Sequence, residues 1–586
     1  MCSIPPAFIL MIGAALLPLL PRQVRSISFL IFPVWAFMVL LNMKVGNVVT
    51  VSFLNYELIL CQVDKLSLVF GYVFAIAAFI GGIYAFHIDD IMQQSSTLLY
   101  VSGAFGVTFA GDLFTVLAFW ELMAVASATL VWAKRTPESN KSAMRYLMYH
   151  MIGGSLLMAG ILLHYHATGS ILFNHFEPSI ASYLIMISFC INAAVPPFHA
   201  WLPDAYPQGT ITSSVFLSAF TTKTAVYVLI RGFAGHEILI WGGVIMALYG
   251  VVFAVLENDV RRLLAYHIIS QVGYMVTAVG IGTTMALNGA AAHAFAHILY
   301  KGLLFMGVGA VLYSTGKSKL TELGGLATAM PVILGLYMIG AFSISGFPLF
   351  SGFVSKSMVI SAAAEDHLNW VAMLLTLASI GTFLHTGLKL PYFTWMGENQ
   401  GAKPEKPIPI GMYIGMSLAA ALCFAIGVLP SMFYELLPHS VHYHPYSPVH
   451  LVETSQLLIF TGISFWYLIN KLGGEATLTL DTDWFYRKTG PFCSQITATS
   501  LNGLNELAEK WIVKGVISKL CYFTKQGPAN LAAFILTPYW RLRFNPEQVE
   551  KERHNLYRTM DTGATTLAIM SLGFTIYIAL MLYWVA

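Results

Sequence analysis

Long apolar runs follow one another along almost the whole chain and are separated by short polar loops. A helix needs about 20 mainly apolar residues to cross the hydrocarbon core of a bilayer, and sixteen segments come close to that length. These segments are 5–20, 27–43, 66–86, 96–111, 113–132, 143–167, 181–200, 210–231, 239–256, 263–281, 288–313, 330–362, 369–396, 408–430, 452–470 and 563–585. The pattern predicts an all-α polytopic membrane protein, with about 14 core transmembrane helices and two further C-terminal spans.

Basic residues are concentrated in alternate loops. They follow odd-numbered segments and are nearly missing after even-numbered ones. The residues concerned are Arg22, Arg25, Lys134, Arg135, Lys141, Arg145, Arg261, Arg262, Lys317, Lys319, Lys403 and Lys406. Because cytoplasmic loops carry an excess of Lys and Arg, we expect this side to face the cytoplasm. Both termini are then periplasmic, in a multi-pass protein of the inner (plasma) membrane.

Residues 471–562 follow the fifteenth segment, so the same argument predicts that they lie on the cytoplasmic side. They contain many basic residues, and the stretch 500–523 has apolar residues at helical spacing with lysines on its other face. Such a stretch is typical of an amphipathic helix at a membrane surface. A cytoplasmic helix that packs against its own subunit is an equally good interpretation.

The composition supports the membrane assignment. Hydrophobic residues make up 57% of the chain and charged residues only 10%, whereas a soluble protein has about 25% charged residues. The formal net charge of +3 gives no reason to expect nucleic acid as a partner. The six cysteines are scattered without metal-like spacing, and no glycine-rich dinucleotide motif occurs. We therefore expect neither a cofactor nor a metal, so any redox centres would lie on other subunits.

Charged side chains occur in the middle of several apolar segments. They include Glu121 in the fifth, Lys223 in the eighth and Lys301 in the eleventh. A charge at bilayer depth costs roughly 2.5–3.5 kcal/mol on insertion scales, so such residues are rare unless they pair, line water or carry protons. One charge in each of several spans predicts an ion or proton pathway. Structural hydrogen bonding is the alternative role for Glu121.

The eleventh segment contains a polar stripe. His293, His297 and Lys301 are spaced four residues apart and therefore share one helix face. Histidine changes its protonation near physiological pH, so the stripe is suited to a hydrated proton wire. Structural hydrogen bonding is an alternative. Metal binding is another, although no third ligand is apparent.

Two more lysines are candidates for the same pathway. Lys356 follows a Gly/Pro interruption in the twelfth segment, and unwound backbone at membrane depth is tolerated where it lines water or protein. Lys389 follows His385 by four residues in the thirteenth segment. A long lysine side chain near a helix end also extends to the membrane surface in many proteins, so that interpretation of Lys389 stays open.

The interruptions suggest an internal repeat. Pro/Gly-rich breaks occur in the seventh and twelfth segments, and lysines occur in the eighth and thirteenth. An offset of five spans gives two copies of opposite orientation, the inverted-repeat layout of many transporters. The expected parts are N-terminal spans (1–95), a first repeat (96–231), a second inverted repeat (239–396), C-terminal spans (408–470), the amphipathic segment (471–562) and the last span (563–586).

Six motifs between about residues 60 and 400 resemble one family of membrane proteins. They are FWELM, PPFHAWLPDAYP, LSAFTTKTAVYVLIR, ENDVRRLLAYHIISQVGYM, HAFAHILYKGLLFMGVG and SGFPLFSGFVSKS. The family is the antiporter-like one shared by Mrp-type Na⁺/H⁺ antiporters, proton-pumping subunits of respiratory complex I and membrane-bound hydrogenases. The body resembles the D-type subunit of Mrp antiporters, whereas the C-terminal extension is similar to the long lateral helix of the largest complex I antiporter-like subunit.

The resemblance implies roles for individual residues. Glu121 resembles the family's glutamate of the fifth span and Lys223 its lysine of the eighth. His293, His297 and Lys301 resemble the central relay, and Lys356 resembles the lysine of the broken twelfth span. The family usually has a lysine five residues before the proline of its P-x-H-x-W-L-P-D-A motif, where this chain has Asn192. The usual cationic partner of the glutamate is therefore missing. Either Lys223 takes over as its partner, or this subunit conducts without antiport, or it has lost transport and serves as a scaffold.

Three functions follow from the resemblance. The leading one is a proton-translocating subunit of a multisubunit Na⁺/H⁺ antiporter, a secondary transporter and not an enzyme. The second is a proton-pumping subunit of an NADH-quinone oxidoreductase or hydrogenase complex. The third, favoured by Asn192, is a transport-inactive scaffold. The expected partners are other membrane subunits, H⁺, Na⁺ and the lipid bilayer.

Overall fold

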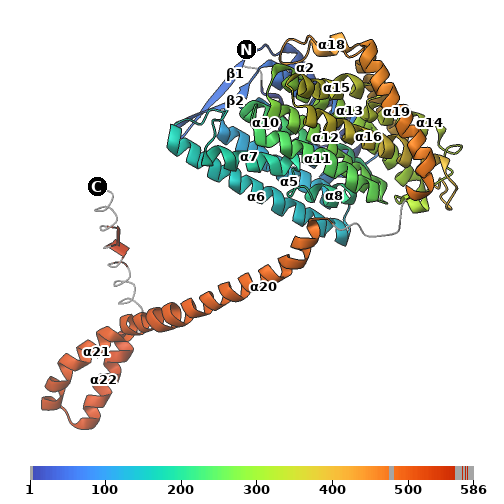
Figure 1. Ribbon diagram of the computed structural model, residues 1–586. Helices are drawn as coiled ribbons and strands as arrows, with labels where there is room; N and C mark the ends of the chain where they lie inside the picture. Colours follow the sequence, from blue (N-terminus) through green and yellow to red (C-terminus); the bar gives the residue numbers. More distant parts are fainter. Residues whose placement is uncertain (1–3, 474–480, 561–570, 572–573, 576, 579–586) are drawn as a thin grey trace. The chain divides into compact units, whose positions relative to one another are not determined.

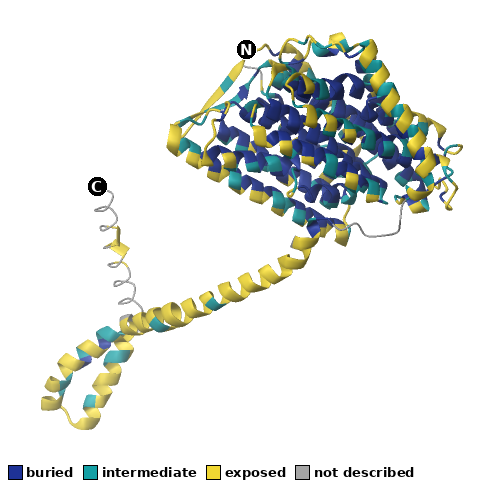
Figure 2. Cartoon of the chain, viewed as in Figure 1, coloured by how far each residue is buried: buried dark blue, intermediate teal, exposed yellow. Residues whose placement is uncertain are grey.

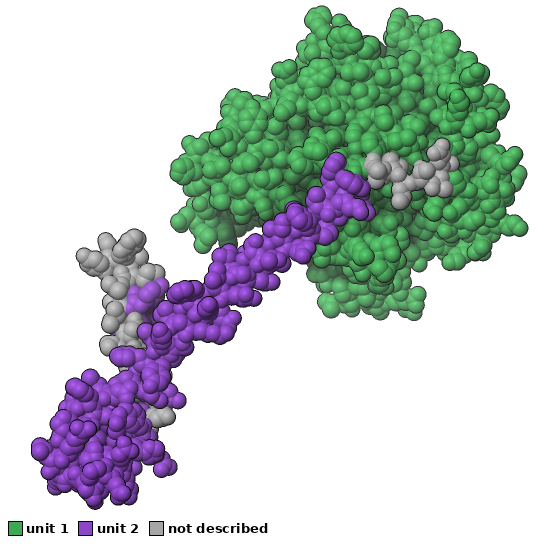
Figure 3. Space-filling view, turned by 60° about the horizontal axis from the view of Figure 1, so that its bottom comes forward, with its two compact units in different colours: residues 1–482 green, residues 483–586 purple. Residues whose placement is uncertain are grey.

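The computed structural model describes residues 4–473 and 481–560, together with residues 571, 574–575 and 577–578. The chain divides into two compact units, Met1–Thr482 and Asp483–Ala586 (Figure 3). Large apolar side chains dominate the interior of the first unit. It is a bundle of membrane-length helices (Figure 1).

The helices of the first unit follow the apolar segments closely. Its α-helices are α1 (Pro6–Leu16), α2 (Arg22–Asn42), α3 (Lys65–Tyr84), α4 (Ile91–Phe109), α5 (Leu113–Trp132), α6 (Pro137–Thr168), α7 (Ile180–Ala193), α8 (Trp201–Ala205), α9 (Ile211–Leu217), α10 (Thr221–Phe233), α11 (Glu237–Leu256), α12 (Val260–Ile281), α13 (Thr284–Thr315), α14 (Pro331–Ser345), α15 (Ser351–Glu365), α16 (Asn369–Thr382), α17 (Ile410–Val428), α18 (Pro430–Tyr434) and α19 (Pro448–Leu468). Short 3-10 helices are η1 (Leu17–Leu19), η2 (Tyr206–Gln208), η3 (Leu320–Glu322) and η6 (Ile469–Lys471), and π-helical segments are η4 (Phe383–Lys389) and η5 (Tyr392–Met396).

The predicted all-α polytopic membrane fold is confirmed. Among the described residues, 11 helical stretches are long and apolar enough to cross a membrane. Each of the first fifteen expected segments lies on one or more helices. The sixteenth, 563–585, lies mostly outside the described residues.

A β-hairpin between α2 and α3 is the one element of another kind in the described first unit. Strands β1 (Val48–Phe53) and β2 (Tyr56–Gln62) pair antiparallel. The Asp112 carboxylate accepts a 2.7 Å hydrogen bond from the backbone N–H of Ile59 and also caps α5 through the N–H of Thr115. One buried carboxylate thus fixes the hairpin to the α4–α5 connection.

The centre of the bundle is formed by α9–α10, α12 and α13. In their most apolar windows, α9–α10 and α12 are 100% buried and α13 is 94% buried (Figure 2). A helix that is surrounded by other helices on all sides needs no amphipathic pattern. Small residues allow neighbouring helices to approach each other closely. Gly273 of α12 lies against the backbone of Gly243 and Ala247 in α11, where a side chain would not fit. The polar residues of α13 are therefore held deep inside the protein.

Two spans are interrupted as the sequence predicts. Helix α7 ends at Ala193 and α14 at Ser345, and the residue that follows each helix, Ala194 or Gly346, adopts the left-handed conformation, with φ of 64° and 75°. Pro196 and Pro197 follow the first break, and proline neither donates a backbone hydrogen bond nor continues a helix. The chain becomes helical again at α8 and α15, which leaves backbone carbonyls free at both breaks.

Two further irregularities were not expected from the sequence. Residues 218–220 separate α9 from α10, and the thirteenth segment changes from α-helix to π-helix at Phe383. Both irregularities adjoin a lysine, Lys223 in the first case and Lys389 in the second. π-helical turns are often found at functional sites.

The second unit is helical. It consists of α20 (Asp483–Ala508), the π-helical η7 (Glu509–Ile517), α21 (Ser518–Arg543) and α22 (Pro546–Met560). Helices α21 and α22 pack as a hairpin, in which the Tyr557 hydroxyl donates to the Asn530 side chain. The predicted helix over 500–523 is confirmed as a helix. Its position at a membrane surface stays a prediction.

Candidate functional site

Glu121 lies in the middle of α5 and contacts α6. Its carboxylate lies against Gly154, where a Cβ atom would come within 1.5 Å of Oε1. The side chain is partly exposed, and no hydrogen bond or ion pair joins it to another described residue. Lys223, which the sequence left open as a substitute cationic partner, is therefore not paired with Glu121. A glycine makes room for the carboxylate instead.

Asn192 bonds to a histidine that the sequence analysis missed. The Nδ1 atom of His150, on α6, lies 2.9 Å from Asn192 Oδ1, and the imidazole packs against Tyr146 and Trp201. Both His150 and Asn192 are fully buried. Neither His150 Nε2 nor Asn192 Nδ2 has a partner among the described residues. A histidine in the middle of the apolar segment 143–167 was the signal that could have identified this pair.

Lys223 is held at the break between α9 and α10. Its ammonium donates to the Ser218 carbonyl at 2.7 Å and to Thr222 Oγ1 at 3.1 Å. The carbonyl is free to accept because the helix is interrupted after Leu217. The break thus provides a polar environment for a lysine whose side chain is fully buried.

The three polar residues of α13 form a buried row. His293 Nδ1 lies 3.3 Å from Ser355 Oγ on α15, and the rings of His293 and His297 are 6.2 Å apart. Neither His297 nitrogen, nor Lys301 Nζ, has a hydrogen-bond partner in the described chain. Buried polar groups of this kind usually bind ordered water, so the row is suited to hydration.

The row is electrostatically connected to the other lysines. Lys223 and Lys301 lie close enough to His297 for their charges to act on it. His267 of α12, another residue missed from the sequence, is within such range of Lys301, Lys356 and Lys389. Its ring is 6.1 Å from that of His385. The structure therefore brings Lys223, the α13 row, Lys356 and Lys389 together, whereas no such interaction links Glu121 to them in the described residues.

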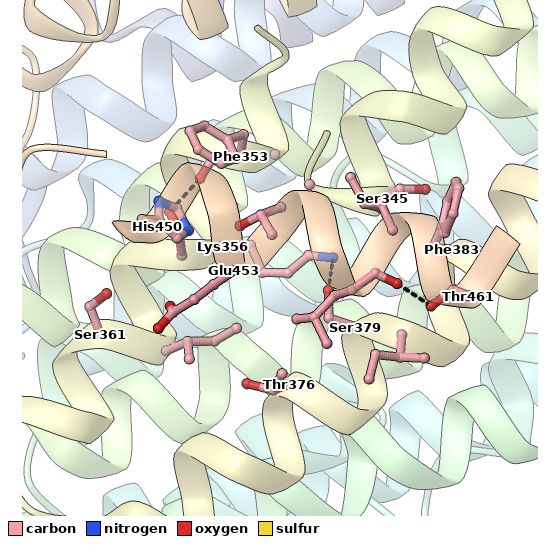
Figure 4. A pocket seen from close by; sticks show the side chains of 18 of the residues that line it. Ser345, Phe353, Lys356, Ser361, Thr376, Ser379, Phe383, His450, Glu453 and Thr461 are labelled. Atoms are coloured by element: carbon pink, nitrogen blue, oxygen red, sulfur yellow. Dashed lines mark hydrogen bonds between the residues drawn. The ribbon is translucent and has the colours of Figure 1, made fainter. Parts of the chain in front are cut away.

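Lys356 and Lys389 are both buried at irregular backbone. Lys356 Nζ donates to the Ile344 carbonyl at 2.7 Å. It also donates to Ser379 Oγ at 3.2 Å (Figure 4). Lys389 Nζ donates to the Val255 carbonyl near the end of α11 at 2.6 Å. Because Lys389 is only 1% exposed, its ammonium does not extend to the surface of the chain. Within the described residues, no group of three or more His, Cys, Asp or Glu side chains could hold a metal ion.

A second buried cluster joins residue 481 to the bundle. His199 Nε2 lies 3.1 Å from Asp481 Oδ1, and the hydroxyls of Tyr249 and Tyr266 each donate to this carboxylate at 2.5 Å. Burial alone would raise the pKa of Asp481, but hydrogen bonds and the nearby imidazole hold that pKa below its usual range. The cluster fixes the end of the first unit to α11, α12 and the segment before α8.

A bundle of membrane-length helices with ionisable residues buried inside it is typical of one class of protein. This class consists of membrane proteins that carry charge through a helical bundle. The family model for NADH:quinone oxidoreductase/Mrp antiporter transmembrane subunits matches residues 110–382. The chain belongs to this family. It is a proton-conducting membrane subunit of the type shared by Mrp antiporters and complex I-like assemblies.

Individual relatives give the same result. The uncharacterized protein MJ1309 of Methanocaldococcus jannaschii is 30% identical over 369 residues, which are 59% of this chain and 76% of that protein. The D-type subunit of the Na⁺/H⁺ antiporter of Alkalihalophilus pseudofirmus is 29% identical over 332 residues, which are 53% of this chain and 67% of that protein. A chain of the membrane-bound sulfane sulfur reductase, an archaeal respiratory membrane complex, matches with a TM-score of 0.66 and 25% identity, covering 78% of this chain and 98% of its own length.

Proposed function

We propose that this chain is the proton-translocating subunit of a multisubunit antiporter that exchanges Na⁺ for H⁺ and is driven by the proton motive force. The observation that carries the proposal is the buried row on α13, His293, His297 and Lys301. The His297 nitrogens and Lys301 Nζ have no hydrogen-bond partner in the described chain. Burying such atoms without hydration costs several kcal/mol. A proton path explains why they are present.

In the proposed mechanism, protons move between neighbouring groups through water. A neutral imidazole accepts a proton on one nitrogen and releases one from the other. A buried lysine gives up its proton more readily than an exposed one, because the charged form is poorly solvated. Lys223 feeds the row from one side, and Lys356 and Lys389 receive protons on the other. Glu121 acts at the entrance, where its partial exposure gives access to water or to a neighbouring subunit.

Sodium and the partner subunits enter the proposal through a relative. The similar protein of Alkalihalophilus pseudofirmus is one subunit of an Na⁺/H⁺ antiporter, a name that implies other subunits in the same complex. Helices α20 to α21 expose many large apolar side chains, including Leu504, Trp511 and Phe523. Such a surface is stabilised by contact with lipid or with other membrane subunits.

A proton-pumping subunit of a redox complex is the second candidate. It is favoured by the similarity to a chain of an archaeal respiratory membrane complex. In that case electron transfer on other subunits drives the movement of protons along the same row of residues on α13. This chain itself would carry no redox centre.

Ion flux in vesicles distinguishes these candidates. The purified complex is reconstituted with a pH-sensitive dye inside, and Na⁺, K⁺ or choline is added with and without an electron donor. Antiport predicts a pH change with Na⁺ and no donor. A pH change that requires the donor replaces the first candidate with the second, and no change in any condition leaves a scaffold.

The repeat and the orientation are part of the same proposal. The breaks after α7 and α14, each with a left-handed end residue, support two inverted repeats at 96–231 and 239–396. The basic loops support a plasma-membrane protein with both termini periplasmic. Impermeant thiol labelling tests the orientation in a variant whose native cysteines are replaced by serine. His442→Cys is expected to react from outside and Lys510→Cys only from inside, and the reverse pattern would overturn the orientation.

A further inference from the structure

Two ionisable side chains lie on the same face of α6. The Glu121 carboxylate of α5 lies against Gly154, and His150 precedes that glycine by four residues. Positions four residues apart on a helix are neighbours, with about 5–6 Å between their Cβ positions. A separation of that order is too long for a direct hydrogen bond, and one or two waters span it. Glu121 and His150 are therefore within reach of each other through water.

The hydrogen bond to Asn192 fixes one proton on the His150 ring. Nδ1 lies 2.9 Å from Asn192 Oδ1, and an amide oxygen only accepts, so Nδ1 donates. The neutral ring then keeps a lone pair on Nε2, which is buried and has no hydrogen-bond partner among the described residues. The ring centroid lies 4.2 Å from that of Tyr146 and 4.7 Å from that of Trp201. His150 is thus a proton acceptor held in one orientation.

Other polar groups on α7 near this ring also lack hydrogen bonds. Asn192 Nδ2 and Ser188 Oγ, one turn earlier on α7, are buried without a partner in the part of the chain that the structure describes. Buried polar groups are usually satisfied by protein or by ordered water. These groups, together with His150 Nε2, therefore favour bound water between α6 and α7, where a proton leaving Glu121 would travel.

A row of hydroxyl groups leads from His150 to the break between α9 and α10. The Tyr146 hydroxyl, whose ring packs against His150, lies 2.8 Å from Ser127 Oγ and 3.5 Å from Thr221 Oγ1. Helix α10 begins at Thr221, two residues before Lys223. A hydroxyl group both donates and accepts hydrogen bonds, so such a row can pass a proton along. It joins the surroundings of His150 to those of Lys223.

We propose that His150 carries protons between Glu121 and Lys223, with Asn192 as a positioning residue. Protonated Glu121 releases its proton through water to Nε2 of His150, so that the ring becomes an imidazolium ion and Glu121 a carboxylate. The imidazolium then releases the Nε2 proton through the hydroxyl row to the neutral Lys223 amine, which becomes an ammonium ion. The proton on Nδ1 stays in its hydrogen bond with Asn192 throughout. The inference rests on the proposed function, because it needs protons to move from Glu121 to the buried lysines.

Two histidines of α6 allow a matched transport test. His150→Gln removes the buried ring, whereas His166→Gln removes an exposed ring near the end of the same helix. We expect proton flux in vesicles, normalised to the amount of assembled complex, to fall about 100-fold with His150→Gln and to stay at the wild-type rate with His166→Gln. Wild-type flux in His150→Gln overturns the inference and leaves the proposed function in place. A wild-type complex that moves no protons overturns both.

A double variant separates proton transfer from a purely structural role of the ring. If the proton passes from Glu121 to His150 in series, the variant with both Glu121→Gln and His150→Gln transports no worse than the slower single variant. If the two losses of flux multiply in the double variant, His150 acts independently of Glu121, and the inference is overturned.

Asn192→Leu tests the same step with every ionisable group in place, and it decides the matter if His150→Gln does not assemble. Leucine has about the size of asparagine and is favoured in membrane helices, so we expect the complex to form. The substitution removes the acceptor of the Nδ1 proton and with it the fixed orientation of the ring. We expect proton flux to fall about tenfold, and wild-type flux in Asn192→Leu would overturn the positioning role and the proposed transfer through a fixed Nε2.

Discussion

Gly154 makes the position of Glu121 testable without changing any charge. An alanine there would place Cβ 1.5 Å from Oε1 and 2.7 Å from the carboxyl carbon of Glu121. Ordinary contact begins at 3.4 Å, so the oxygen must move by about 2 Å. Gly154→Ala therefore displaces the carboxylate while leaving its chemistry intact.

The size of the effect follows from this displacement. Forcing a side chain off its rotamer costs about 0.5–1.5 kcal/mol, which partly exposed Glu121 tolerates by turning outward. A proton relay needs heavy atoms about 2.6–3.2 Å apart, and a misplacement of about 1 Å reduces a reaction by up to 100-fold. We expect Gly154→Ala to lower proton flux about 10- to 100-fold, close to the effect of Glu121→Gln, with the complex still assembled.

Gly153→Ala is the matched control. A Cβ at residue 153 would lie 3.7 Å from Asn192 Oδ1 and 3.8 Å from Ser188 Oγ, which are ordinary contacts. Both alanines gain the same helix propensity, about 0.5–1 kcal/mol. The assay is the initial rate of pH change in vesicles, normalised to the amount of assembled complex. Equal rates for the two variants would refute a positional role for the Glu121 carboxylate.

Two further predictions concern the missing lysine and the cluster at residue 481. If Lys223 and Glu121 act as one unit, the variant with both residues changed to alanine transports no worse than either single variant. In that case Asn192→Lys also restores part of the proton flux of Lys223→Ala. If the losses of flux in the two single variants add up in the double variant, Lys223 and Glu121 act separately. Asp481→Asn should release the end of the first unit, at a cost of about 3–5 kcal/mol for a broken buried pair, and hydrogen exchange of residues near His199 should rise. Because the folded pKa of Asp481 is depressed, its contribution to stability is present above the unfolded value of about 3.9 and is lost as pH falls through the folded pKa. The protection factors there, which correct for the base catalysis of amide exchange, should therefore not change between pH 5 and 8.

Sequence patterns predicted the helices well, because each membrane-spanning helix needs a run of about 20 mainly apolar residues that can be recognised in the sequence. The breaks after α7 and α14 were predicted from Pro196 and Gly346 for a similar local reason. The break at residues 218–220 contains neither glycine nor proline. The local sequence therefore gives no sign that the helix is interrupted there. The β-hairpin was missed because its strands, of six and seven residues, are too short for a search based on spans.

The sequence predicted individual residues of the candidate site, but it did not predict which residues of different helices lie in contact. The spacing of His293, His297 and Lys301 gave their common helix face. The hydrogen bond between His150 and Asn192 joins residues 42 positions apart, and that between His199 and Asp481 joins residues 282 apart. Such pairs depend on how helices pack, which no local pattern encodes. For the same reason, the sequence could not decide whether Lys223 pairs with Glu121, whose carboxylate lies against a glycine in the fold.

The most direct test of the proton row compares two lysines of very different burial. Lys301 is fully buried in α13, whereas the side chain of Lys319, just beyond that helix, is 59% exposed. Lumenal pH is followed in vesicles that contain the assembled complex with Lys301→Gln or Lys319→Gln, under the condition that drives the wild type. The account predicts that Lys301→Gln abolishes the pH change and that Lys319→Gln leaves it unchanged. A wild-type pH change in an assembled Lys301→Gln complex would contradict the claim that protons pass through the α13 row.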